Sequence, residues 1–125
     1  MKDKADDLLT VEIEATRDDV VIVRLVGEID ISSAHLLTSQ IARMAKEGRS
    51  AVILDATEVN FMDSTGVHAL VEGKRTLHDN RTRIFLVASR QVRRVLELVF
   101  PDPLFATRVD SVDEALAAFD DQEPS

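Results

Sequence analysis

The sequence contains no cysteine, so disulfide bonds, thiolate zinc sites and thiol catalysis are excluded. It also lacks Trp and Tyr and has five Phe, which leaves few aromatic rings on which nucleic acid bases could stack. No apolar run approaches the roughly 18 residues of a membrane span, and no apolar stretch follows the charged start at residues 1–7. These absences lead us to expect a cytoplasmic protein that does not bind a membrane.

Acidic residues outnumber basic ones in this chain. Twenty-three Asp and Glu against fifteen Lys and Arg give a formal charge of −8. Such a charge repels phosphate backbones and anionic lipids, which argues against nucleic acid as a partner. Five arginines nevertheless lie close together in the sequence, and we interpret them as part of a solvated surface: Arg81, Arg83, Arg90, Arg93 and Arg94.

Length and apolar content indicate one small domain. The 125 residues lie within the usual range of about 100–200 per domain. The 45% of apolar residues can supply a core built from Val, Leu, Ile and Ala. We expect this domain to cover residues 8–120, with residues 1–7 and 121–125 as loose, charged termini.

Alternating and continuous apolar runs predict the strands. Residues 8–15 alternate between apolar and polar side chains, as a half-buried edge strand does, and residues 17–19 form a polar connection of hairpin length. The apolar run at residues 20–26 should therefore pair antiparallel with the first strand and be covered on both faces. Shorter apolar runs predict three further strands, at residues 51–54, 84–87 and 104–109.

Capping residues and a spacing of three to four predict about four helices. Ser32 or Ser33 can cap the first, the second follows residues 59–66, and Pro101 ends the third. Residues 111–114 form a capping box that opens the fourth. The alternation of strands and helices predicts an α/β fold with a mostly parallel sheet, an antiparallel N-terminal edge strand and right-handed crossovers.

Residues 59–66, Val-Asn-Phe-Met-Asp-Ser-Thr-Gly, form a junction between a predicted strand and a predicted helix. Asp63 and Ser64 are residue types that cap helices, because their side chains accept hydrogen bonds from the free N–H groups of the first turn. The same N–H groups, with the positive end of the helix dipole, could hold a phosphate on Ser64. We therefore expect a functional site where this helix begins, near Thr65.

The segment Phe61–Gly66 resembles the Asp-Ser-Ser/Thr-Gly signature of STAS domains, above all that of the bacterial anti-sigma factor antagonists. The segment Val20–Asp30, followed by Ser33 and Ala34, resembles the other recurring segment of this family. Two residues depart from the antagonist pattern. Thr65 stands where serine is common, and His68 stands where the antagonists often carry a small residue.

The resemblance implies a non-enzymatic switch that needs no cofactor and no metal. In the unphosphorylated state it would bind an anti-sigma factor that has serine kinase activity, and so free a sigma factor for transcription. Phosphorylation of Ser64 by that kinase would block the binding. A phosphoserine phosphatase would then restore it.

The two family segments should meet in space, because the carboxyl ends of neighbouring parallel strands lie at one edge of a sheet. Asp30 and Asp63 would then flank Ser64, either as turn and capping residues or as groups that orient its hydroxyl toward a kinase. Gly66 should allow a close approach of two backbones. The expected partner-binding surface around Ser64 consists of Asp30, Met62, Asp63, Thr65 and Gly66.

Two other functions are kept as alternatives. The first is a STAS module that senses a ligand and works outside sigma-factor control. The second is a two-component receiver in which Asp55 would be the self-phosphorylating carboxylate. Glu28 and Asp30 could mimic the magnesium-binding pair of such a receiver, but residues 104–110 lack the lysine that it needs after its last strand.

The hypotheses of a catalytic site and of a metal site have weaker support in the sequence. A serine hydrolase is disfavoured because Met62 stands where the Gly-x-Ser-x-Gly motif requires glycine. His68 and Glu72 lie four residues apart and could share a helix face, but two ligands of mixed type are common by chance. We interpret them as a surface pair.

Overall fold

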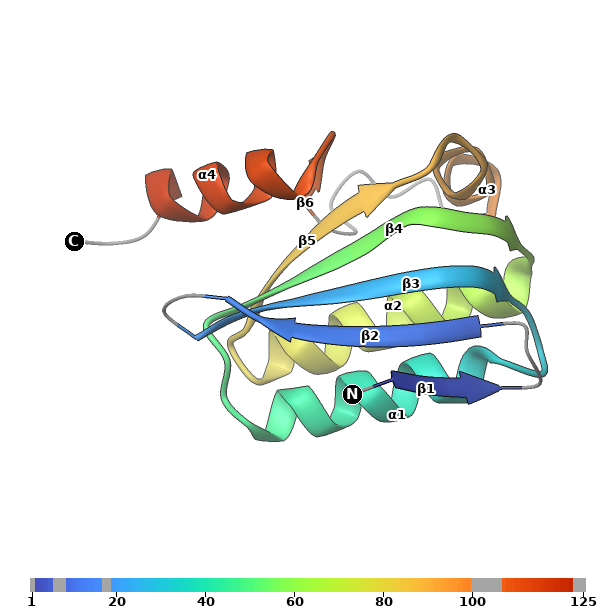
Figure 1. The fold of residues 1–125 in the computed structure, drawn as a ribbon, viewed down its shortest axis with the longest axis horizontal. Helices are drawn as coiled ribbons and strands as arrows, with labels where there is room; N and C mark the ends of the chain where they lie inside the picture. Colours follow the sequence, from blue (N-terminus) through green and yellow to red (C-terminus); the bar gives the residue numbers. More distant parts are fainter. Residues whose placement is uncertain (1, 6–8, 17–18, 100–106, 123–125) are drawn as a thin grey trace.

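A mixed six-stranded sheet runs through the described part of the chain, which comprises residues 2–5, 9–16, 19–99 and 107–122 of a computed structural model. The strands lie side by side in sequence order, from β1 to β6 (Figure 1). The first three strands pair antiparallel, and β3 to β6 run parallel to one another. The strands are β1 Lys2–Ala5, β2 Leu9–Ala15, β3 Val20–Ile29, β4 Ala51–Met62, β5 Arg83–Ala88 and β6 Thr107–Val109.

The predicted α/β class and the antiparallel start of a mostly parallel sheet are confirmed, and the N-terminus differs from expectation. Lys2–Ala5, which we expected to be loose, pairs with β2 and forms the edge strand in its place. This strand was not predicted because its residues are mostly charged. An edge strand is paired on one side only and commonly carries charges that discourage further pairing. The predicted first residue of β2, Leu8, lies outside the described residues.

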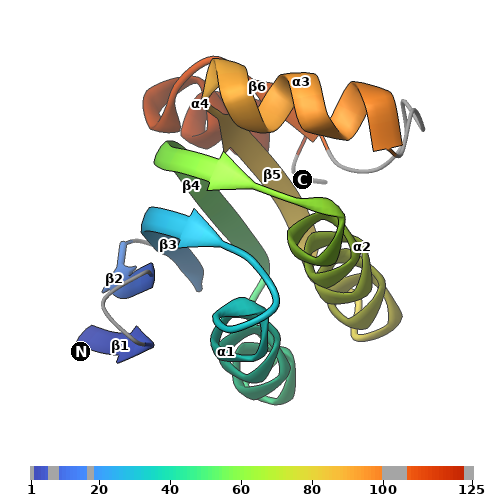
Figure 2. The same ribbon diagram turned by 90° about the vertical axis from the view of Figure 1, so that its right-hand side faces the viewer.

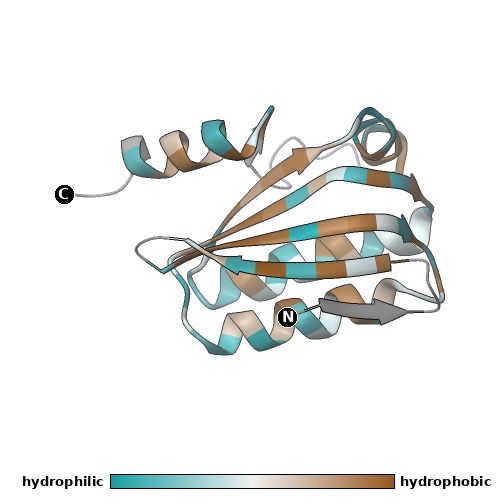
Figure 3. Cartoon of the chain, in the orientation of Figure 1, coloured by the Kyte–Doolittle hydropathy of each residue, from teal (hydrophilic) through white to brown (hydrophobic). Residues whose placement is uncertain are grey.

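Four helices occur in the described part of the chain, in agreement with the prediction, and they cover both faces of the sheet. Residues of α1, α2 and α3 share one apolar cluster with alternate residues of the strands. α4 packs on the opposite face against Phe85 and Val87 of β5. Figure 2 shows α1 and α2 together on one side of the sheet, and Figure 3 shows that the central strands are largely hydrophobic. The helices are α1 Ala34–Lys46, α2 Ser64–Asp79, α3 Arg90–Val99 and α4 Val112–Gln122.

The strand β4 is much longer than the apolar run that predicted it. It continues past Leu54 to Met62, so that residues 59–62, half of the segment 59–66, belong to a strand. Two register shifts interrupt its pairing with β3, and Gly27 beside them has a positive φ of 116°. These irregularities disturb the alternation of inward and outward side chains. The period of two that marks a strand is therefore lost in this half of β4.

Helix α4 begins where the sequence predicted and ends later than predicted. The Ser111 hydroxyl accepts the Glu114 N–H at 3.0 Å, as in a capping box, while the Glu114 carboxylate accepts the Asp110 N–H at 3.2 Å. Helix α4 continues to Gln122, so residues 121–122 are helical rather than loose. The predicted helix stop at Pro101 lies outside the described residues.

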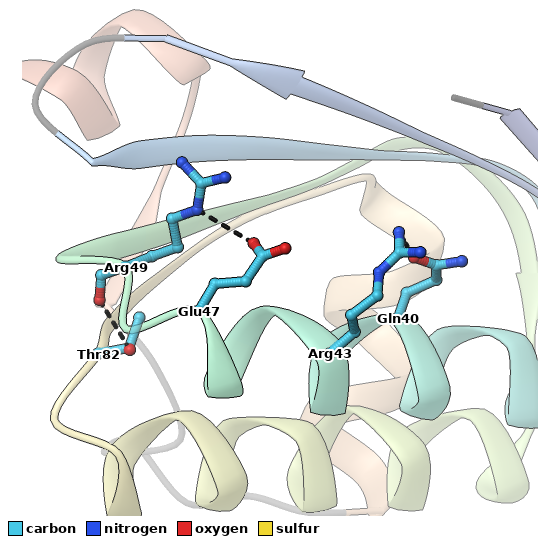
Figure 4. A network of polar contacts seen from close by, with 5 residues as sticks. All are labelled: Gln40, Arg43, Glu47, Arg49 and Thr82. Atoms are coloured by element: carbon cyan, nitrogen blue, oxygen red, sulfur yellow. Dashed lines mark hydrogen bonds and ion pairs between the residues drawn. The ribbon is translucent and has the colours of Figure 1, made fainter.

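Polar contacts join two connections at the amino ends of the parallel strands. The buried Thr82 hydroxyl donates to the Arg49 carbonyl at 2.8 Å, and the Arg49 guanidinium lies 3.2 Å from the Glu47 carboxylate (Figure 4). The Arg83 N–H also donates to the Ser50 carbonyl at 3.0 Å. These bonds serve to fix the connections that precede β4 and β5.

Candidate functional site

The two sequence segments singled out above meet where β3 and β4 end. Ile29 pairs with Met62 in the parallel register, and the Asp63 N–H donates to the Ile29 carbonyl at 3.4 Å. This edge of the sheet faces the viewer in Figure 2, where the chain leaves β3 for α1 and leaves β4 for α2. The predicted convergence of the two segments is therefore confirmed.

Gly66 lies where the start of α2 presses against the end of β3. A Cβ atom at this position would lie 2.7 Å from the Ile29 carbonyl oxygen and 2.7 Å from Met62 Cγ. Real Cβ atoms essentially never come so close, and a backbone carbonyl cannot rotate away as a side chain can. Glycine is thus required by the packing of the two segments, as the sequence suggested. Gly66 is buried, however, so it does not belong to the expected partner-binding surface.

Asp63 caps α2, and Ser64 is the first residue of the helix. The Asp63 carboxylate accepts the Gly66 N–H at 3.1 Å, while its carbonyl accepts the Val67 N–H at 3.1 Å. The Ser64 side chain is exposed and has no hydrogen-bond partner among the described residues. A free hydroxyl at a helix start, beside N–H groups that can take anionic oxygens, is chemically suited to phosphorylation.

Asp30 is held within its own turn. Its carboxylate accepts the Ser32 hydroxyl at 2.7 Å and the Ser32 N–H at 2.9 Å, and the Ser33 hydroxyl lies 3.4 Å away. The hydrogen bond from the Ser32 hydroxyl is the main reason why the pKa of Asp30 lies below its usual value. No hydrogen bond joins Asp30 to Ser64 within the described residues, so the role of this carboxylate in its own turn has the stronger structural basis.

Ser33 also has a structural role that differs from the predicted cap. It occupies the cap position of α1, but its hydroxyl makes no capping bond to the helix. The hydroxyl instead accepts the Asp30 N–H at 3.0 Å and donates to the Glu28 carbonyl at 2.9 Å. The side chain is fully buried. It therefore ties the end of β3 to the turn that follows.

Met62 requires a correction to the expected partner-binding surface. Its side chain is only 4% exposed and belongs to the apolar cluster under α1 and α2, so it cannot contact a partner directly. Two apolar residues that the sequence reasoning missed are exposed nearby, Ile31 at 81% and Phe61 at 46%. The sequence could have indicated Ile31, because it is an isolated large apolar residue inside a polar turn.

Asp55 does not have the position that a receiver phosphorylation site needs. It lies within β4, well before the strand ends, and its side chain is 6% exposed. Its carboxylate accepts the Thr57 hydroxyl at 2.7 Å and the Thr57 N–H at 3.1 Å, and lies 3.6 Å from the Arg24 guanidinium. The carboxylate is thus engaged inside the sheet, away from the edge where such domains place their chemistry.

The other candidate groups do not form a second site. Among the described residues, no group of three or more His, Cys, Asp or Glu side chains could hold a metal ion. The five arginines that lie close together in the sequence make different contacts. Arg83 lies over the rings of Phe85 and Phe119, while Arg93 pairs with Asp110 at 3.5 Å. In the described part of the chain, no helix combines the length and the apolar character that crossing a membrane requires.

Comparison with known proteins gives one family. A model of the STAS domain matches residues 12–115, which include both segments at the site. An anti-sigma-B factor antagonist from Staphylococcus epidermidis is 27% identical over 84 residues, covering 66% of this chain and 78% of that protein. The anti-sigma factor antagonist from Mycobacterium paratuberculosis, a crystal structure, has a TM-score of 0.79 at 27% identity and covers 92% of this chain and 97% of its own.

A likeness in fold extends to a protein whose structure was solved with the phosphate attached. The phosphorylated form of the Bacillus cell fate determinant SpoIIAA has a TM-score of 0.65 at 23% identity, covering 86% of this chain and 97% of its own. At this identity the comparison concerns the fold alone.

Proposed function

This chain belongs to the STAS domain family, and from that premise we propose that it is an anti-sigma factor antagonist switched by phosphorylation of Ser64. The observation that carries the proposal is the free, exposed Ser64 hydroxyl at the start of α2, beside the Asp63 cap. The matched relatives named as antagonists give the partner class. The partner is then an anti-sigma factor with serine kinase activity, and the place of action is the cytoplasm.

In the unphosphorylated state, the partner binds the edge of the sheet around Ser64. Ile31 and Phe61 supply exposed apolar surface there, and buried apolar side chains at the centre of an interface contribute most of the binding energy. Thr65 is half-buried beside Ser64 and adds a hydroxyl at the rim. Binding sequesters the anti-sigma factor and leaves the sigma factor free.

Phosphorylation reverses this state by changing the charge of the same surface. A phosphate adds about −1.5 to −2 charges, and a partner surface shaped for a neutral hydroxyl offers no counter-charge of its own for the excess negative charge. An unpaired buried charge costs several kcal/mol, and each 1.4 kcal/mol weakens binding about tenfold. The phosphorylated protein should therefore bind at least about a hundredfold more weakly, until a phosphoserine phosphatase removes the group.

The test is to incubate the protein with the kinase-type anti-sigma factor of its own genome, ATP and Mg²⁺, and to map the phosphate by mass spectrometry. We expect one acid-stable phosphate on Ser64, which is lost in Ser64→Ala and kept in the neighbouring control Thr65→Ala. Affinity for the same partner is then measured before and after modification. An acid-labile phosphate on Asp55, formed from a small phosphodonor without any kinase, would establish the receiver alternative instead.

A further inference from the structure

The exposed side of α2 carries a line of polar side chains that begins at Ser64. The buried side of the helix is formed by Gly66, Leu70, Gly73 and Leu77, among others. Residues four positions apart lie one above the other on a helix. The exposed line that results, opposite the buried side, consists of Ser64, His68, Glu72 and Arg75.

His68 is the member of this line that lies one turn after Ser64. Helical side chains lean toward the N-terminus of their helix, so the surface that a residue covers lies over the preceding turn. The spacing therefore places the exposed imidazole of His68 over the turn that carries Ser64. A neutral Ser64 hydroxyl offers this ring at most a weak hydrogen bond, whereas a phosphate offers a strong anionic acceptor.

We propose that His68 is the counter-charge of phosphorylated Ser64, so that phosphate and imidazole titrate as a coupled pair. This inference rests on the proposed phosphorylation of Ser64. The second proton of a phosphoserine dissociates near pH 6, and histidine is the side chain type whose ordinary pKa lies nearest to that value. Two such groups side by side share their titration. The pair gives the phosphorylated surface a charge that depends on pH near neutrality.

Other charged groups lie on α2 and in the turn before α1, and two of them are engaged by hydrogen bonds. On α2, the Asp63 carboxylate accepts the Gly66 N–H, and Glu72, one turn beyond His68, competes with the phosphate for the ring. In the turn before α1, the Asp30 carboxylate is held by Ser32. The elements that contact α2 carry further exposed charged groups: His35 on α1, Glu58 on β4, and Arg90 and Arg94 on α3.

The test uses the full chain with phosphoserine incorporated at position 64 during translation, so that no kinase is needed. NMR follows the imidazole signals from pH 5 to pH 8.5 in the phosphorylated and unphosphorylated proteins. We expect the titration midpoint of His68 to rise by about 0.15 to 0.7 pH unit when the phosphate is present, as for an exposed ion pair. His78 is the internal control, because it lies on the last turn of the same helix. This turn is about 21 Å from Ser64 along the helix axis.

The reciprocal measurement uses the phosphorus signal of the same protein. His68→Gln should raise the midpoint of the phosphate by an amount close to the rise seen for His68, because coupling between two sites is reciprocal. The matched variant His78→Gln should leave it unchanged. Equal shifts of His68 and His78, or a phosphate midpoint that does not respond to His68→Gln, would overturn the inference. Because the phosphate is built in, this result is separate from whether a kinase modifies Ser64.

Discussion

Two strand-to-helix turns lie side by side in this domain, and both contain an aspartate with a serine one or two positions later. In the turn from β3 to α1, the Asp30 carboxylate accepts the N–H and hydroxyl of Ser32, and Ser33 is buried with its hydroxyl fully used. In the turn from β4 to α2, the Asp63 carboxylate caps the helix and the next serine, Ser64, is exposed. The serine hydroxyl groups are thus engaged within the first turn, whereas the hydroxyl group of Ser64 in the second turn is free.

The difference comes from where each helix begins. α1 begins at Ala34, so the serines that follow Asp30 lie inside the turn and bind its polar groups. α2 begins at the serine itself, so the helix directs that side chain outward. Position within the turn, rather than residue type, therefore decides which hydroxyl a kinase can reach.

The largest effect should come from forcing the two turns apart with Gly66→Ala. The added Cβ would lie 2.7 Å from the Ile29 carbonyl oxygen, and overpacking against a rigid backbone costs about 1–3 kcal/mol. We expect a loss near the upper end of that range, measured as a lower midpoint in urea unfolding with an unchanged m-value.

The matched control is Gly73→Ala on the same helix. Its Cβ would lie 2.5 Å from Ile41 Cδ1, the far end of a flexible side chain that can rotate, and alanine favours a helix interior by about 1 kcal/mol over glycine. We therefore expect a much smaller change. An equal loss in the two variants would mean that contact between the turns is not what Gly66 protects.

An intermediate effect should separate the two serines directly. Ser33→Ala leaves the Asp30 N–H and the Glu28 carbonyl without their buried partner, and such unsatisfied groups cost about 1–3 kcal/mol. Ser64→Ala removes an exposed hydroxyl and should change the free energy of unfolding by less than about 0.5 kcal/mol. Thermal and urea unfolding of the two variants give the comparison, and similar losses would show that Ser64 also has a structural role.

Much of this contrast could be predicted from the sequence. The strand and helix order required the two segments to meet, and an Asp-Ser pair before an apolar helix indicated a cap, which Asp63 provides. The free hydroxyl of Ser64 followed from the same reasoning. These features depend on local residue preferences and on topology, and both can be inferred from one chain.

The exceptions have physical causes that sequence patterns do not show. Met62 was expected on the surface because it belongs to the signature segment beside Ser64. The register shifts hide from the sequence the strand that carries Met62 into the core. The roles of Ile31 and Phe61 depend on their exposure, which only the three-dimensional structure gives. Lys2–Ala5 forms a strand through pairing with β2, not through its own composition.

The smallest effect should be the contribution of Asp30 to acid stability. The Ser32 hydroxyl and the turn N–H groups favour the charged carboxylate, so the pKa of Asp30 in the folded protein lies below its ordinary value of 3.8. A lowered pKa means that the charged form stabilises the fold above that value and that this contribution is lost as pH falls through the folded pKa. Wild-type protein should therefore be more stable than Asp30→Asn at pH 6, and the difference should shrink as pH falls below 3.8.

The source of this difference can be isolated in a Ser32→Ala background, which removes the main stabilising hydrogen bond. Asp30→Asn should then have a smaller effect at pH 6, because the two changes act on one interaction and are not additive. Urea unfolding of the four proteins at pH 6 and pH 3 gives the cycle. If the effect of Asp30→Asn were the same at pH 6 and pH 3, the carboxylate would not be held by its turn as a charged group. Asp30 would then be as free as Ser64 to meet a partner, and the contrast between the two turns would rest on the serines alone.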